Sequence, residues 1–241
     1  MTRYIQRHSL LTRVTHGVPA VACILLAVTG VFVFVPSLGG GIMGGEFTQT
    51  MRMLHRVLAV PFILVPLFAV LKSPAGFVHL FKEDIFGKWD KDDVTWAMKF
   101  PFYLFAPGKV HMPPQHHVKS AQRLADGALL FFCIMLALSG IVLWLNTGFP
   151  TGSGLKVDFA PETLLLAHLV HDVFFFLTVF VGIAHIYLGA GIFQPYRGTA
   201  RIMFGDGKVS ESDAVYHWGY WANEEIALGK NVTVEKDGKE K

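Results

Sequence analysis

Four long apolar segments dominate the 241-residue sequence and limit what it can fold into. They cover residues 16–38, 53–72, 122–145 and 162–193. Crossing the hydrocarbon core of a bilayer, which is about 30 Å thick, takes roughly 20 helical residues. Backbone groups in lipid must find hydrogen-bond partners within their own segment, so we expect each span to be a helix. The sequence therefore predicts an all-α membrane protein, a four-helix transmembrane bundle.

Composition agrees with residence in a membrane. Hydrophobic residues make up 52% of the chain and charged residues only 16%, whereas soluble domains are about 25% charged. The arginines before the first segment resemble the start of a signal peptide. The apolar run then continues for about 18 residues and no small-residue cleavage site follows it, so we expect a retained span. Cys23 and Cys133 lie inside apolar runs and are expected to be small core residues.

Basic residues gather at the N-terminus, in the loop at 73–121 and just after the last span. The positive-inside rule makes that side cytoplasmic and predicts that both termini lie inside. Within this loop, residues 94–110 are apolar and aromatic but too short to span, so we expect them to lie along the membrane interface. The predicted domains are a transmembrane domain, 1–203, and a cytoplasmic tail, 204–241, which docks a partner and ends in disorder.

Histidines inside the last apolar segment are the strongest functional signal. His171 and His185 are 14 residues apart, which is about 40° short of four helical turns, so both lie on nearly the same face. Their separation in depth is about 21 Å, which places one near each leaflet. His168 lies about 100° around the helix from His185 and about 60° from His171, and is poorly aligned with the pair.

The other spans offer one histidine at each depth. His16 opens the first span on the inner side, and His55 opens the second span on the outer side. Depth alone then allows two pairs, His16 with His185 inside and His55 with His171 outside. Two such pairs, enclosed by apolar walls, are what two bis-histidine b-type haems require.

Histidines in a membrane span can also serve purposes besides haem ligation. An intramembrane histidine can simply hydrogen-bond a neighbouring helix, and His168 competes with His171 as a ligand. A dinuclear metal site would bring carboxylates, which these spans almost lack. A haem-free proton-coupled transporter or metal carrier would line a path with acidic residues, and only Asp126 and Asp172 lie in or near a span. We expect solvated or partner-facing roles for the remaining histidines: His8, His79, His111, His116, His117 and His217.

Five stretches together resemble a known family. They are "RVTHG", "MRMLHRVLA", "SAQRLADGALLF" leading to "SGIVLW", "VHDVFFFLTVFVGIAHIYLG" and the tail "GKVSESDAVYHWGYW". In their order and spacing, over about residues 7–221, they resemble the γ subunit, a membrane cytochrome b, of respiratory formate dehydrogenases. The wider group includes the cytochrome b subunits of nickel–iron hydrogenases.

The resemblance implies a di-haem electron carrier in a prokaryotic inner membrane. The resemblance implies two haem b groups, with His16 and His185 as ligands of the inner one and His55 and His171 as ligands of the outer one. The family position that matches His168 is not a ligand. Electrons would come from a periplasmic molybdopterin-containing α subunit through an iron–sulfur β subunit. They would pass across the membrane to menaquinone or ubiquinone, so this chain would not itself oxidise the substrate. A hydrogenase or another molybdopterin oxidoreductase is the alternative partner.

The quinone site of that family has an Asn-x-Gly-Gln stretch at the start of the third span. This sequence has Lys119-Ser120-Ala121-Gln122 there, so only the glutamine matches. Gln122 could hydrogen-bond a quinone carbonyl, and Lys119 could replace the asparagine as a donor, with Ser120 beside it. Four arginines near the expected haem edges could pair with propionates or simply snorkel to the interface: Arg13, Arg52, Arg56 and Arg123.

Overall fold

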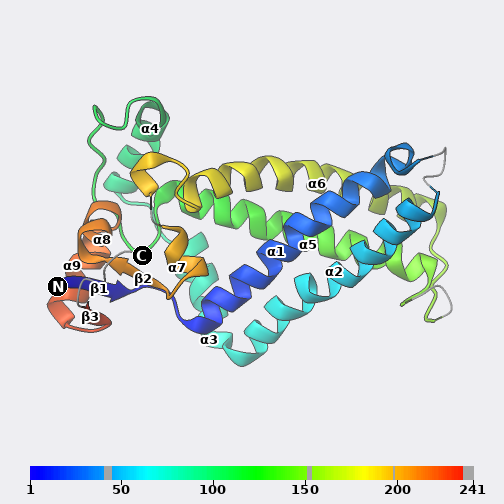
Figure 1. Cartoon of the computed structure of the whole chain (residues 1–241), viewed down its shortest axis with the longest axis horizontal. Coiled ribbons are helices and arrows are strands. Elements are labelled where there is room, and N and C mark those ends of the chain that lie inside the picture. The colour runs from blue at the N-terminus through cyan, green and yellow to red at the C-terminus, as the bar shows by residue number, and fades with distance from the viewer. Residues whose placement is uncertain (41–44, 151–153, 198, 236–241) are drawn as a thin grey trace. The chain divides into compact units, whose positions relative to one another are not determined.

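The computed structural model describes residues 1–40, 45–150, 154–197 and 199–235. Two compact units are present (Figure 1). The terminal unit comprises Met1–Val14, Ser73–Gly127 and Ala184–Lys241, and the helical unit comprises Thr15–Lys72 and Ala128–Ile183. In chain order the elements are β1 (Thr2–Gln6), α1 (Leu10–Phe34), η1 (Pro36–Gly39), α2 (Gly45–Lys72), α3 (Pro74–His79), η2 (Leu80–Ile85), α4 (Lys91–Phe105), α5 (Ser120–Thr147), α6 (Pro161–Gly189), η3 (Gln194–Tyr196), α7 (Ala200–Phe204), β2 (Lys208–Ser210), α8 (Glu211–His217), α9 (Gly219–Leu228) and β3 (Val232–Glu235).

Helices α1, α2, α5 and α6 are long and apolar enough to cross a membrane, which confirms the prediction of an all-α protein with four transmembrane helices. Their ends differ from the predicted ones. Helix α1 begins at Leu10 rather than at residue 16, because the Ser9 hydroxyl caps it and accepts a hydrogen bond from the Thr12 N–H at 3.2 Å. Helix α2 already begins at Gly45, and α6 ends at Gly189 rather than at residue 193.

The helical unit buries small side chains and exposes large ones. Its buried span residues include Ala22, Thr29, Ser139 and Thr178. Large apolar side chains such as Phe180 face outward instead. Helices in lipid pack through small residues, because lipid solvates large apolar side chains as well as a protein core does. This packing is the pattern expected of a membrane-embedded bundle.

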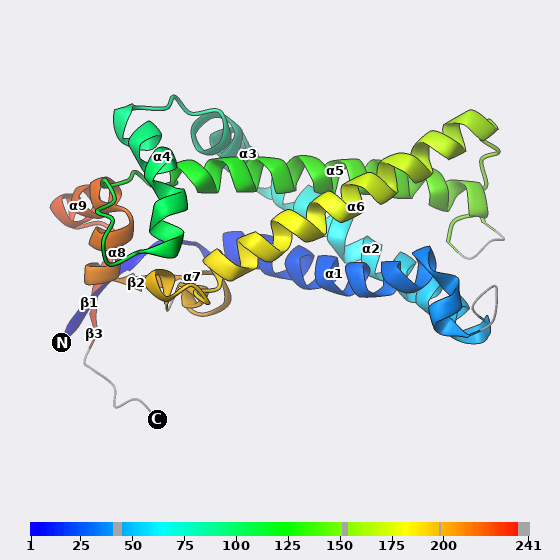
Figure 2. The same ribbon diagram turned by 90° about the horizontal axis from the view of Figure 1, so that it is seen from above.

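The terminal unit contains a three-stranded antiparallel sheet with the order β2-β1-β3 (Figures 1 and 2). Strand β1 pairs with β3, with Thr2 opposite Glu235. The first residues and residues 232–235 therefore belong to one sheet and lie on the same side of the membrane. A core of buried apolar residues supports the sheet: Ile5, Ile202, Val209, Ala214, Trp218, Trp221 and Ala222.

The predicted tail is folded as far as it is described. Residues after 204 form β2, α8, α9 and β3, and they share the terminal unit with β1 and the loop before α5. The predicted division between residues 203 and 204 therefore does not coincide with the boundary between the units. The disorder predicted for the end "VEKDGKEK" covers residues 234–241. Val234 and Glu235 belong to β3, and residues 236–241 lie outside the described residues.

Helix α4 has two apolar faces. Trp96 and Tyr103 are buried in the terminal unit, whereas Val94, Met98 and Phe102 are exposed and recur every four residues. An exposed apolar stripe of this kind suits a helix that lies in the membrane interface. The interfacial placement of residues 94–110 stays a prediction.

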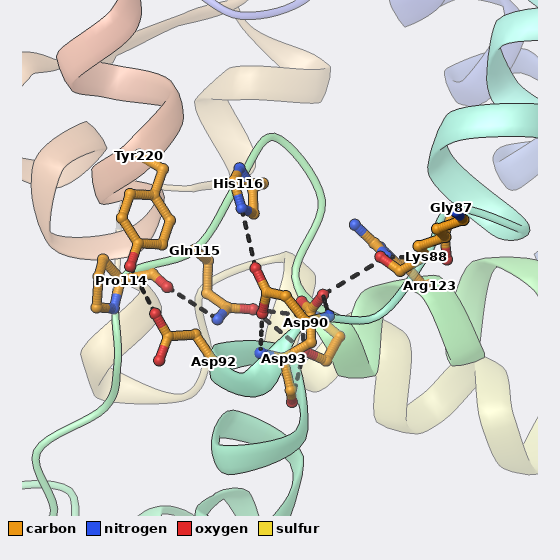
Figure 3. Close-up of polar contacts among 11 residues, drawn as sticks. Gly87, Lys88, Asp90, Asp92, Asp93, Pro114, Gln115, His116, Arg123 and Tyr220 are labelled. Carbon is orange, nitrogen blue, oxygen red and sulfur yellow. Dashed lines mark hydrogen bonds and ion pairs between the residues drawn. The ribbon is translucent and has the colours of Figure 1, made fainter.

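A buried polar network fixes the start of α5 against α4 (Figure 3). Asp90 and Asp93 cap α4 reciprocally, each accepting a hydrogen bond from the backbone N–H of the other, at 2.8 and 3.1 Å. The Ser120 hydroxyl lies 3.0 Å from Asp93 Oδ1 and 3.2 Å from Gln115 Oε1. Arg123 pairs with Asp93 at 3.7 Å and donates to two loop carbonyls. Nearly every polar group at this junction has a partner within the terminal unit.

Replacing Asp93 should destabilise the terminal unit strongly. Asp93→Ala removes a helix cap and leaves the buried Arg123 guanidinium without its counter-charge, which costs roughly 3–5 kcal/mol. Chemical unfolding of the detergent-solubilised chain measures the change. Asp158→Ala is the control, because the Lys156–Asp158 pair is largely exposed and is worth at most about 1 kcal/mol. Equal losses in the two variants would contradict a structural role for the network.

Candidate functional site

Helices α2 and α6 bring His55 and His171 together in the helical unit. Their ring centroids are 6.3 Å apart and the ring planes are inclined at 68°. Both side chains are half-buried, whereas His168, one turn before His171, is exposed. The structure thus brings together the two histidines that the depth argument paired and leaves their rival at the surface.

The distance between the two rings fits one metal ion bound axially. With metal–imidazole bonds of about 2 Å and a further ~1 Å from each ring nitrogen to its ring centre, two axial imidazoles have centroids roughly 6 Å apart. The observed 6.3 Å agrees with that spacing. The donor set, two imidazoles in an apolar surrounding, is the one that a b-type haem uses.

The Thr29 side chain of α1 is hydrogen-bonded to Nδ1 of His55. Thr29 Oγ1 is 2.9 Å from His55 Nδ1 and 3.0 and 3.1 Å from the carbonyl oxygens of Leu25 and Leu26. Carbonyl oxygens only accept, so the hydroxyl can give its proton to one of them while its oxygen accepts from Nδ1–H. In that tautomer the proton of the neutral imidazole is on Nδ1, and Nε2 keeps its lone pair.

Ser139 of α5 does the same for His171. Ser139 Oγ is 3.0 Å from His171 Nδ1 and 2.7 and 3.2 Å from the carbonyl oxygens of Met135 and Leu136. The same assignment of protons leaves Nε2 of His171 free to bind a metal. A second partner that fixes the tautomer and the orientation of the ring is a regular feature of metal-binding histidines.

A glycine follows each of these hydroxyl residues and makes room for the ring. A Cβ atom on Gly30 would lie 3.4 Å from His55 Cε1, and one on Gly140 would lie 3.3 Å from His171 Cε1. Glycine thus lets each imidazole lie close against the helix that carries its hydroxyl partner.

The two histidines predicted for the inner haem lie in different units, His16 in the helical unit and His185 in the terminal unit. His185 Nδ1 is 3.6 Å from Asp126 Oδ1, and Asp126 Oδ2 accepts a hydrogen bond from Gln122 at 3.1 Å. A carboxylate thus lies near the Nδ1 side of His185. The pairing of His16 with His185 stays a prediction.

The residues predicted for the quinone site have different surroundings. Ser120 is fully buried and bonded into the network around Asp93. Lys119 is also buried, with Nζ 3.2 Å from His217 Nδ1 and 3.8 Å from the centre of the Tyr196 ring. Gln122 contacts Asp126 and is the only one of the three connected in this way to a predicted haem ligand.

His217 was expected to face solvent or a partner, and this expectation is wrong. The side chain is buried between Lys119, Tyr196 and Trp218. Burial, and then the positive charges of Lys119 and Arg7, lower the pKa of His217 to about 2. Burial likewise lowers the pKa of Lys119 well below its ordinary value. His217 is neutral at physiological pH, and its Nδ1 accepts a hydrogen bond from Lys119.

Two of the four predicted propionate partners have structural contacts in the terminal unit. Arg13 donates to the Gly205 carbonyl, and Arg123 donates to loop carbonyls near Asp93. The other two belong to the helical unit and flank His55 on α2. Arg56 follows His55 directly and donates to Thr147 Oγ1 at 3.1 Å, and Arg52 is half-buried one turn earlier. A propionate role stays a prediction, and these positions suit it best.

Thr29, Ser139 and Asp126 were not predicted as site residues. The sequence does contain a signal for the first two, because spans one and three each carry a hydroxyl residue followed by glycine, in "VTGVF" and "LSGIV". Asp126 was noted only as an acidic residue near a span. Its contact with His185 joins α5 to α6 and has no signature in either segment alone.

The stability of the terminal unit should fall as the pH drops below 6.5. In the unfolded chain His217 has its ordinary pKa of 6.5 and takes up a proton, whereas in the folded chain, with a pKa of about 2, it does not. The stability that the neutral His217 contributes is thus complete above pH 6.5 and is lost as the pH falls toward the folded pKa, by about 2 kcal/mol at pH 5. Tryptophan fluorescence during unfolding follows this change.

His217→Gln should reduce that pH dependence, because the titrating group is gone. His111→Gln, which removes an exposed histidine of the same unit, should retain it. An unchanged slope in His217→Gln would contradict the burial of a neutral imidazole.

Comparison with known proteins identifies the family to which the chain belongs. The family model described as prokaryotic cytochrome b561 matches residues 7–206. No curated protein matches the chain. Members of this family are membrane cytochromes b that bind haem b, transfer electrons and span the prokaryotic plasma membrane several times, in agreement with the four apolar helices. The chain belongs to the prokaryotic cytochrome b561 family.

Proposed function

We propose that this cytochrome b holds two haems and carries electrons across the membrane from a partner oxidoreductase to a quinone. The observation that carries the proposal is the pair His55 and His171, whose rings are 6.3 Å apart and whose Nε2 atoms are both left with a free lone pair. A haem-free transporter gives no reason for this spacing, and the family binds haem b.

Haem b, when bound, supplies reversible one-electron transfer. His55 and His171 hold the outer haem, and His16 and His185 hold the inner one. The chain's own contributions are the ligands, their fixed tautomers and a lipid-facing apolar sheath that excludes water. Arg52 and Arg56 on α2 supply positive charge for the propionates of the outer haem.

The proposed orientation places the terminal unit in the cytoplasm. Both ends of the described chain meet in its sheet, so they share one side. The N-terminal arginines and the basic loop at 73–121 also belong largely to this unit. The positive-inside rule then makes this side cytoplasmic and the His55–His171 pair periplasmic. Electrons would enter from an iron–sulfur subunit outside.

Gln122 is the residue we assign to the quinone. Lys119 and Ser120 are buried and already bonded, so their roles are to fix the C-terminal segment and the start of α5. Gln122 lies on the first turn of α5 and is linked through Asp126 to His185. Its amide can donate to a quinone carbonyl on the side where protons are taken up. Menaquinone is the acceptor that the formate dehydrogenase resemblance implies.

The proposed partner is a molybdopterin formate dehydrogenase with its iron–sulfur subunit. This choice rests on the motifs from "RVTHG" to the tail "GKVSESDAVYHWGYW". Identifying the large subunit that co-purifies with the chain tests it. A nickel–iron hydrogenase in its place would overturn the partner and leave the haem assignments intact.

Haem content tests the ligand assignment. The purified chain should bind two haems and show b-type bands in a reduced-minus-oxidised spectrum. His55→Ala or His171→Ala should each remove one haem, because one axial bond and one wall of the site are lost. His168→Ala, on the same helix as His171, is the matched control and should retain both haems.

Two results would contradict the proposal. A wild-type chain without b-type bands would refute the cytochrome function. Loss of one haem in His168→Ala, combined with full occupancy in His171→Ala, would move the outer ligand to His168.

Quinone contact is tested by the rate at which the reduced chain is oxidised by a soluble quinone analogue. Gln122→Leu removes one hydrogen bond, worth about 1–1.5 kcal/mol, and should lower kcat/KM for the quinone roughly tenfold. Gln194→Leu, at an exposed glutamine of the same unit, should leave the rate unchanged. Equal rates in wild type and Gln122→Leu, with both haems retained, would exclude Gln122 from the quinone site.

A further inference from the structure

Thr29 and Ser139 have a role that the assignment of ligands does not include. We infer that their hydroxyls are positioning groups that set the midpoint potential of the outer haem by fixing the protons on His55 and His171. The inference rests on the proposed function, since it requires that these two histidines bind iron.

The helical unit builds the same arrangement twice. Thr29 Oγ1 of α1 lies 2.9 Å from His55 Nδ1 of α2, and a Cβ atom added to Gly30 would lie 3.4 Å from His55 Cε1. Ser139 Oγ of α5 lies 3.0 Å from His171 Nδ1 of α6, and a Cβ atom added to Gly140 would lie 3.3 Å from His171 Cε1. In both cases a hydroxyl residue and the glycine after it contact an imidazole of the next transmembrane helix.

Each hydroxyl lies between an imidazole and backbone carbonyls of its own helix, and the donors and acceptors of these hydrogen bonds follow in order. Each hydroxyl has a single proton, and when it donates this proton to a carbonyl of its own helix, its oxygen accepts from Nδ1–H. Both residues are 6% exposed. Water therefore has no ready access to replace the hydroxyl if it is removed, and only the backbone carbonyl of Leu26 at His55 and of Leu136 at His171 would remain near each ring. The hydroxyl is the side-chain partner of Nδ1 in each case.

Hydrogen bonding at Nδ1 alters the iron through the imidazole. A ligand whose Nδ1–H donates to an acceptor is a more basic donor through Nε2, and a more basic ligand stabilises the oxidised iron. Removing the acceptor should therefore raise the midpoint potential of the haem. The oxygen near Nδ1 of His185 belongs to the carboxylate of Asp126, at 3.6 Å, rather than to a hydroxyl.

The test is a redox titration of the full-length chain, with the two haems resolved by their visible spectra. Thr29→Val keeps the shape of the side chain and removes the hydroxyl, and Ser139→Ala does the same for serine. Each should raise the potential of one haem and leave the other unchanged, and the double variant should show a larger shift. Thr29→Ser and Ser139→Thr restore a hydroxyl and should return the potential to the wild-type value.

Thr50→Val is the control. Thr50 lies in the same unit on α2, about 140° around the helix from His55, and its exposed hydroxyl donates to the Glu46 carbonyl at 3.0 Å. Its replacement should leave both potentials unchanged. A shift equal to that of Thr29→Val would mean that the loss of any hydroxyl in the unit changes the potential, and would overturn the inference.

The remaining outcomes separate the inference from the proposed function. Unchanged potentials in the double variant with both haems bound would refute the inference and leave the haem assignment standing. A wild-type chain that binds no haem would refute the proposed function itself. If Thr29→Val loses a haem, recovery in Thr29→Ser supports the inference, because only the hydroxyl is then restored, and failure to recover overturns it.

Discussion

A buried imidazole has two ring nitrogens, and each needs a partner when no water is present. This constraint organises the helical unit. Nδ1 of His55 and Nδ1 of His171 donate to hydroxyls, and those hydroxyls donate to carbonyls of their own helices. Nε2 is the remaining nitrogen on each ring, and the ring centroids are 6.3 Å apart, so in the proposed site these two nitrogens would hold the haem iron. Glycines and other small residues then bring the helices close enough for these contacts.

The two units differ in the size of the side chains that they bury, because lipid surrounds the helical unit and water surrounds most of the terminal unit. The helical unit keeps small residues inside and turns large apolar side chains to lipid. The terminal unit buries Ile5, Trp218 and Trp221 beneath a small sheet, as a water-soluble domain does. Its contacts join the N-terminal strand, the loop before α5 and the C-terminal segment. One chain therefore combines a membrane bundle with a compact unit built from its ends and its central loop.

The sequence predicts the spans because hydrophobic length is a local property. It also predicts the pairing of His55 with His171, because depth in a membrane can be counted along a helix. It fails where a contact joins distant segments. The composition after residue 204 indicates a polar tail, but it carries no signal that β3 pairs with β1 at the other end of the chain. His217 is buried for the same reason, since its neighbours Lys119 and Tyr196 come from other segments. Ser9 is different, because its capping signal was present locally and moved the start of α1 to Leu10.

The threonine and serine hydroxyls also affect how the protein is assembled. Metal binding to histidine normally competes with protons, because the coordinating nitrogen must be deprotonated first. When the imidazole protons of His55 and His171 are on Nδ1, beside the hydroxyls of Thr29 and Ser139, both Nε2 atoms are already deprotonated. In the proposed site, a metal held by these atoms would then displace no proton into the apolar surroundings.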